Sequence, residues 1–171
     1  ACEEIVEKHC PDWVLNTAAF TAVDDAESAA ALASQVNALA PGALAQALEK
    51  TGGRMLQIST DFVFDGNKTS PYLPSEPLSP LGVYGATKAA GERSVRKALG
   101  SRAYVLRTSW VYGSVGHNFF NTMLKLHSLK ASLGESLNVV SDQFGSPTNT
   151  KALSLACCKL ISKVNSLEKN G

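Results

Sequence analysis

Residues 84–108, YGATKAAGERSVRKALGSRAYVLRT, give the main indication of how this chain folds. The spacing of the apolar residues predicts a helix over residues 84–99, and Gly100 is a typical residue to end it. Residues 103–108 then form an apolar run with the length of a buried strand. A similar run, residues 54–59, precedes the helix. This part of the chain therefore reads as strand, helix and strand.

The same alternation extends along the rest of the sequence. We expect helices at residues 1–10, 28–50, 118–130 and 150–164, and short strands at residues 13–15 and 137–140. Pro41 should either kink the helix predicted over residues 28–50 or start a second one. Strands that alternate with helices of ten or more residues predict an α/β fold, with a parallel sheet and helices on both of its faces.

Small and polar residues follow three of the predicted strands. They form the segments 16–19 (NTAA), 59–61 (STD) and 108–110 (TSW). In a parallel sheet the ligand lies beyond the carboxyl ends of the strands. We therefore expect the chemistry of this protein at one edge of the sheet, where these segments meet.

Tyr84 and Lys88 are the strongest candidates for catalysis. Residues four apart on a helix share a face, so the Lys88 ammonium should lie beside the Tyr84 phenol. A nearby cation favours phenolate and should lower the pKa of Tyr84, which lets a tyrosine exchange a proton with a carbonyl oxygen near neutral pH. The alternative is that Tyr84 and Lys88 form an ordinary pair on the surface of a helix. Thr60, at the end of a predicted strand, favours the catalytic interpretation.

Composition excludes several classes of protein. The chain has 171 residues, 44% of them hydrophobic, with a net charge of +1, as in a globular domain and unlike a nucleic-acid-binding one. No apolar run approaches the ~20 residues of a membrane span. The four cysteines lack a Cys-x-x-Cys spacing and the three histidines lie apart, so we expect no metal site and a reducing, cytoplasmic location.

Five segments, taken together and in this order, resemble the extended short-chain dehydrogenase/reductases, and within them the dTDP-4-dehydrorhamnose reductases. They are 16–24 (NTAAFTAVD), 58–66 (ISTDFVFDG), 80–88 (PLGVYGATK), 107–113 (RTSWVYG) and 142–148 (DQFGSPT). The resemblance implies a Rossmann-like fold and an NAD(P)H-dependent oxidoreductase. The implied reaction reduces the 4-keto group of dTDP-4-dehydro-6-deoxy-L-mannose to give dTDP-L-rhamnose.

The resemblance also implies roles for individual residues. Tyr84 would donate a proton to the keto oxygen, Lys88 would lower its pKa and hold the nicotinamide ribose, and Thr60 would hydrogen-bond the same oxygen. NADPH or NADH would supply the hydride. Ala18, Ala19 and Phe20 would line this cofactor, although a plain turn between strand and helix is the alternative reading of that segment.

Three further residues are candidates for substrate binding. Phe62 stands where the family usually has tyrosine, so a hydroxyl contact would be lost. Trp110 is either a hydrophobic wall against the sugar or a core residue that covers the strand. Gln143 either shapes the substrate side or belongs to a turn before the last helix.

One family motif is missing from the chain. No Gly-x-x-Gly-x-x-Gly segment, which normally places the pyrophosphate at a helix N-terminus, occurs in the 171 residues. We therefore interpret the chain as a fragment with an incomplete sheet, in which N-terminal strands are missing and the substrate-binding part starts at about residue 113. Such a chain should bind NAD(P)H weakly.

Two alternatives to a working reductase remain. The same fold serves as the non-catalytic β subunit of methionine adenosyltransferase, which the chain resembles at Tyr84 and Lys88, and a truncated copy could be inactive. As partners we expect a small nucleotide-sugar substrate and a second copy of the chain, and neither nucleic acid nor a membrane.

Overall fold

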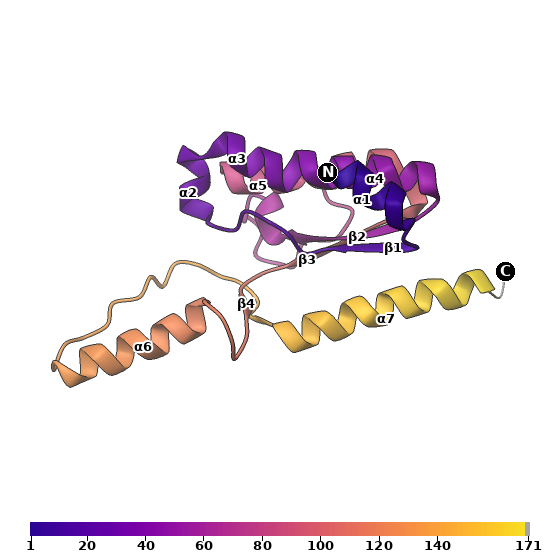
Figure 1. The fold of residues 1–171 in the computed structure, drawn as a ribbon. Coiled ribbons are helices and arrows are strands. Elements are labelled where there is room, and N and C mark those ends of the chain that lie inside the picture. The colour runs from indigo at the N-terminus through magenta and orange to yellow at the C-terminus, as the bar shows by residue number, and fades with distance from the viewer. Residues whose placement is uncertain (170–171) are drawn as a thin grey trace. The chain divides into compact units, whose positions relative to one another are not determined.

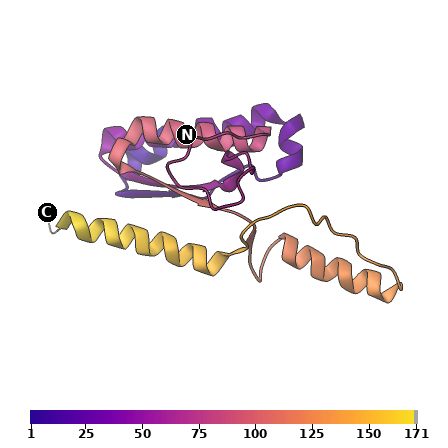
Figure 2. The ribbon, with the colours of Figure 1, turned by 180° about the vertical axis from the view of Figure 1, so that it is seen from behind.

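The computed structural model describes residues 1–169 and divides the chain into two compact units. The first runs from Ala1 to Arg107 and the second begins at Thr108. Figures 1 and 2 show the elements of each unit from opposite sides.

A three-stranded sheet organises the first unit. Its strands are β1 (Trp13–Asn16), β2 (Arg54–Thr60) and β3 (Ala103–Thr108), in the order β1-β2-β3. β1 and β2 are parallel, with Trp13 opposite Arg54 and Asn16 opposite Gln57. The carboxyl ends of these two strands therefore lie side by side, as predicted. The predicted α/β class with a parallel, Rossmann-like sheet is confirmed.

The helices of this unit pack into one layer (Figures 1 and 2). They are α1 (Cys2–His9), α2 (Val23–Ser28), α3 (Ala30–Ser34), α4 (Ala40–Thr51) and α5 (Val83–Leu99). α5 contacts α2, α3 and α4, and α1 packs on α4. Within this unit, therefore, the helices supply one of the two helical layers expected around the sheet.

The core of the first unit lies between this layer and the sheet. Burial of these apolar side chains drives the layer onto the strands. The core comes from α1, α4, β2 and α5 and consists of Val6, Ala45, Ala47, Leu48, Met55, Val95 and Leu99. β3 is less buried than the apolar run predicted, since all six of its residues keep part of their surface exposed.

The helix predicted over residues 28–50 is interrupted. Between α3 and α4 lies a π-helical turn, η1 (Gln35–Leu39), and Pro41 lies in the first turn of α4, where its missing N–H costs nothing. Gly52 ends α4 with a φ of 82°, a conformation that favours glycine. The helical backbone nevertheless continues from Ala30 to Thr51 through this turn, so the option in which Pro41 starts a second helix is wrong.

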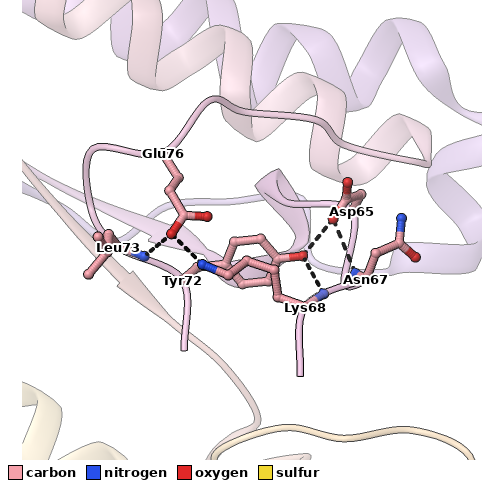
Figure 3. Close-up of polar contacts among 6 residues, drawn as sticks. All are labelled: Asp65, Asn67, Lys68, Tyr72, Leu73 and Glu76. Carbon is pink, nitrogen blue, oxygen red and sulfur yellow. Dashed lines mark hydrogen bonds and ion pairs between the residues drawn. The ribbon is translucent and has the colours of Figure 1, made fainter. Parts of the chain in front are cut away.

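A loop held by hydrogen bonds connects the end of β2 to α5. It follows a short 3₁₀ turn, η2 (Asp61–Val63), and is closed where Ser79 N–H donates to the Val63 carbonyl oxygen at 2.9 Å. Figure 3 shows the Tyr72 hydroxyl between the Asp65 carboxylate and the Lys68 backbone N–H. This segment contains four prolines and is irregular, and it is held by specific side-chain contacts.

The second unit contains two helices and a small parallel strand pair. The helices are α6 (Phe119–Ser132) and α7 (Thr150–Lys169), and β4 (Val111–Tyr112) pairs with β5 (Thr148–Asn149). Asn118 caps α6 by accepting a hydrogen bond from Asn121 N–H at 3.0 Å. Within residues 1–169, no helix is long and apolar enough to cross a membrane.

The strand predicted over residues 137–140 is wrong. Residues 133–147 contain no helix or strand, and Val139 and Val140 are exposed. A strand needs a partner for its backbone groups, and the partner of β4 is β5. The two adjacent valines were therefore not enough to predict a strand.

Candidate active site

Thr60 and Tyr84 meet at the carboxyl end of β2. Thr60 is the last residue of this strand, and its hydroxyl accepts a hydrogen bond from Phe62 N–H at 3.2 Å and donates one to Asp61 Oδ1 at 3.1 Å. Tyr84 lies in the first turn of α5, with its ring 5.7 Å from that of Phe62, and it is near enough to the Thr60 side chain for that hydroxyl to act on its pKa. The two predicted residues are thus brought together from positions 24 residues apart in the sequence.

Lys88 joins them from one turn further along α5. It is buried, and its Nζ donates a hydrogen bond to the Ile58 carbonyl oxygen at 2.8 Å. Ile58 precedes Thr60 by two residues on the same strand. The structure therefore gathers Thr60, Tyr84 and Lys88 at one end of β2.

The electrostatics of this group differ from the expectation. Burial raises the pKa of Tyr84 above 10.0, the nearby Thr60 hydroxyl opposes this rise, and the charge of Asp61 adds to it. Burial lowers the pKa of Lys88 below 10.5, and the charge of Glu92 opposes that fall. The predicted lowering of the Tyr84 pKa by Lys88 is wrong for this arrangement, because burial dominates and the ammonium is bound to Ile58.

Phe62 lies against Tyr84 at the surface. Their rings meet edge to face with centroids 5.7 Å apart, and Phe62 is 47% exposed. A Cβ on Gly85 would lie 2.2 Å from the Phe62 carbonyl oxygen, so only glycine allows α5 to approach this turn so closely. Phe62 is therefore placed to offer an apolar edge to a molecule bound beside Tyr84.

The segment that follows β1 is held in place by Asn37. Asn37 Oδ1 accepts from Phe20 N–H at 2.8 Å, and Asn37 Nδ2 donates to the Phe20 carbonyl oxygen at 3.1 Å and to Thr87 Oγ1 at 3.2 Å. Asn37 lies on the π-turn η1 and is 1% exposed. π-Turns inside helices frequently mark functional sites. This residue fastens the segment containing Ala18, Ala19 and Phe20 to α5, next to Lys88.

Sequence reasoning missed Asn37. A single amide within an alanine- and leucine-rich helical run was the available signal, because a polar side chain on a buried face must find partners. Those partners, the backbone of Phe20 and the hydroxyl of Thr87, lie 17 and 50 residues away.

A second polar connection runs from β1 to Lys88. Asn16 Oδ1 accepts from Ala18 N–H at 3.2 Å, and Asn16 Nδ2 donates to Gln57 Oε1 at 2.8 Å. Gln57 Nε2 in turn donates to the Ile58 carbonyl oxygen at 3.0 Å, the same atom that binds Lys88. Asn16 and Gln57 are both buried, so these contacts fix the two strand ends relative to each other.

The arrangement suits proton transfer to a carbonyl oxygen. A phenol with a raised pKa keeps its proton at neutral pH, and a neighbouring hydroxyl can hold the accepting oxygen. After β1, Ala18 is exposed and carries a small side chain, which leaves the backbone there open to a bound molecule. Among residues 1–169, no group of three or more His, Cys, Asp or Glu side chains is arranged to hold a metal ion.

Comparison with known proteins shows the family of this chain. The family described as "RmlD substrate binding domain" matches residues 1–171. The chain belongs to this family. It is 46% identical over 149 residues to a dTDP-4-dehydrorhamnose reductase of Burkholderia thailandensis, a match that covers 87% of the chain and 48% of the relative. The chain thus spans about half the length of the curated relatives it matches.

Another relative and a solved structure match the RmlD-family chain over a similar share of its length. It is 47% identical over 154 residues to the spore coat polysaccharide biosynthesis protein SpsK of Bacillus subtilis, covering 89% of the chain and 52% of SpsK. Among solved structures, a dTDP-4-dehydrorhamnose reductase of Bacillus anthracis in complex with NADP superposes with a TM-score of 0.87 at 36% identity. The match covers 94% of this chain and 56% of that one.

The remaining candidates of this RmlD-family chain lie in its second unit. Trp110 is 45% exposed, so the alternative of a core residue is wrong. Its φ of 44° is unusual for a bulky residue, and a Cβ on Gly145 would lie 2.5 Å from its ring. Gln143 lies in the irregular segment before β5 and is exposed. The structure places these two residues in the second unit, and Thr60, Phe62, Tyr84 and Lys88 in the first.

Proposed function

We propose that the protein carrying this chain is an NAD(P)H-dependent oxidoreductase that reduces the 4-keto group of dTDP-4-dehydro-6-deoxy-L-mannose to give dTDP-L-rhamnose. The observation that carries the proposal is the gathering of Thr60, Tyr84 and buried Lys88 at the carboxyl end of β2. Relatives named dTDP-4-dehydrorhamnose reductase, at 46% and 45% identity, support the choice of reaction.

The roles of the catalytic residues follow from their surroundings. Tyr84, with its raised pKa, carries the proton that the keto oxygen takes up as the alcohol forms. The Thr60 hydroxyl lies next to it and binds the same oxygen. Lys88 stays fixed by Ile58 and presents its charge beside the reacting group.

The cofactor is NADPH or NADH, which when bound supplies the hydride to the sugar carbon. Ala18, Ala19, Phe20, Tyr84 and Lys88 are the residues of this chain that we assign to its nicotinamide ribose end. Asn37 and Asn16 keep the first three in position through hydrogen bonds to the backbone of Phe20 and Ala18.

The sugar-binding residues are assigned as Phe62, Trp110 and Gln143, together with Thr60. Phe62 offers an exposed ring beside Tyr84, and Trp110 offers half of its surface. We further propose that the protein acts in the cytoplasm as a homodimer, with the part of the chain from about residue 113 belonging to substrate binding. All four cysteines are free, which agrees with a reducing compartment.

A direct assay tests the proposal. The protein that carries this chain is mixed with dTDP-4-dehydro-6-deoxy-L-mannose and either NADPH or NADH, and oxidation of the cofactor and formation of dTDP-L-rhamnose are followed together. We expect product in proportion to the cofactor oxidised. A folded protein that binds the cofactor without making product would instead favour the regulatory alternative.

A further inference from the structure

A buried ion pair lies one turn beyond Lys88 on α5. The Glu92 side chain is 1% exposed, and both of its carboxylate oxygens accept hydrogen bonds from Arg107, from Nε at 2.9 Å and from Nη2 at 2.7 Å. Arg107 stands on β3 with its side chain 15% exposed. Taking a carboxylate out of water is costly, and this two-pronged contact with a guanidinium offsets the cost.

Arg107 also binds the loop that joins β2 to α5. Its third nitrogen, Nη1, donates to the Pro74 carbonyl oxygen at 3.1 Å, and its guanidinium lies over the Phe64 ring at 4.9 Å. Phe64 in turn stacks on Tyr72, with centroids 4.4 Å apart. One side chain thus contacts the loop at two points and α5 at a third.

Glu92 shares a helix face with Lys88, since the two are four residues apart and both are buried. We propose that Glu92 and Arg107 are positioning residues for the Tyr84–Lys88 site: the pair holds a carboxylate one turn from Lys88 and fastens the loop of residues 64–79 to the same helix. The inference rests on the role proposed above for Lys88.

Several other charged groups on elements that pack against α5 have partners of their own. Lys50 on α4 binds glutamates of α1, Arg102 of the turn before β3 binds backbone carbonyls, and Glu27 on α2 accepts from Val83 N–H. Asp61 on η2 is bound to Thr60. The charge of Glu92 acts on the pKa of Lys88, raising it against the effect of burial.

The test measures Lys88 directly in chain 1–171, by NMR titration of isotopically labelled lysine side chains. In Glu92→Gln, which keeps the shape of the side chain and removes its charge, we expect the pKa of Lys88 to shift below its value in the unmodified chain. Glu76→Gln is the matched control. It removes a carboxylate that binds Lys68 and Leu73 in the loop, and it should leave the pKa of Lys88 unchanged.

A second variant covers the case in which Glu92→Gln does not fold because the Arg107 charge loses its partner. The double change Glu92→Gln with Arg107→Gln removes both charges and leaves no unpaired ion. We expect a smaller lowering of the Lys88 pKa than in Glu92→Gln, because the opposing charge of Arg107 is removed as well. Hydrogen exchange of Ser79 N–H should become faster by about tenfold or more, because the loop loses its hydrogen bond to a charged group.

An unchanged pKa of Lys88 in both folded variants would overturn the inference, whatever the activity of the protein. Absence of reductase activity would overturn the proposed function and leave this measurement interpretable. In a protein that does reduce the sugar, Glu92→Gln should also shift the pH profile of turnover, a change that a purely structural role would not produce.

Discussion

The Asn37 side chain holds the backbone of Phe20 at two atoms, accepting from its N–H at 2.8 Å and donating to its carbonyl oxygen at 3.1 Å. The same amide reaches Thr87 on α5. A buried polar side chain thus sets the distance between the segment after β1 and the helix that carries Tyr84 and Lys88.

Replacing Asn37 should therefore weaken the fold and disturb the site together. In Asn37→Ala we expect the free energy of unfolding to fall by about 2 kcal/mol or more, because part-buried backbone groups of Phe20 lose their partner. Chemical denaturation of chain 1–171 measures this. Gln35→Ala, an exposed change on the same π-turn, is the control and should have little effect. Equal effects of the two changes would contradict the assigned role.

Removing the Tyr84 hydroxyl tests the proton donor. In the protein that carries this chain, Tyr84→Phe should lower turnover by about 10²-fold or more and leave cofactor binding nearly intact. Steady-state kinetics and a cofactor titration measure the two quantities. Tyr104→Phe serves as the control, since the Tyr104 ring packs on Trp13 away from the proposed site. Unchanged turnover would remove Tyr84 from the mechanism.

The ionisation of Tyr84 gives a third prediction. Burial raises its pKa above 10.0, so the phenolate absorbance lost in Tyr84→Phe should have a midpoint above pH 10.0. As pH rises, the unfolded chain releases this proton first. The stability contributed by protonated Tyr84 is therefore present below pH 10.0 and is lost as pH rises through the folded pKa. A midpoint below 10.0 would mean that the charge of Lys88 outweighs burial.

Gly85→Ala should destabilise the chain, although alanine is the better helix former by about 1 kcal/mol. The added methyl group would lie 2.2 Å from the Phe62 carbonyl oxygen, and a backbone atom cannot turn aside as a flexible side chain can. We expect a loss of about 1–3 kcal/mol, measured by thermal or chemical unfolding. A more stable Gly85→Ala chain would show that η2 and α5 can separate at little cost.

Chain 1–171 by itself should bind NADPH weakly. A dinucleotide is held largely through its pyrophosphate at a glycine-rich turn, and the 171 residues contain no such motif. Calorimetric titration of the purified chain measures the affinity. Micromolar binding would mean that other residues grip the cofactor. If Lys88→Met abolished that binding, Lys88 would be among them.

The sequence by itself determined the order and type of most elements. Apolar spacing and the glycine at position 100 predicted β2, α5 and β3 to within a residue or two, because these signals are local to each segment. The same reasoning placed Thr60 at a strand end and set Tyr84 and Lys88 four residues apart. It failed at residues 137–140, where a strand needed a partner that the chain supplies elsewhere.

Only the tertiary structure decided the environment of these residues. The direction of the Tyr84 pKa depends on how deeply the phenol is buried and on which atom binds Lys88, and neither can be read from a spacing of four residues. Asn37, Glu92 and Arg107 found partners 15 to 50 residues away. Contacts of this kind form because buried polar groups must be paired once the fold has brought them together.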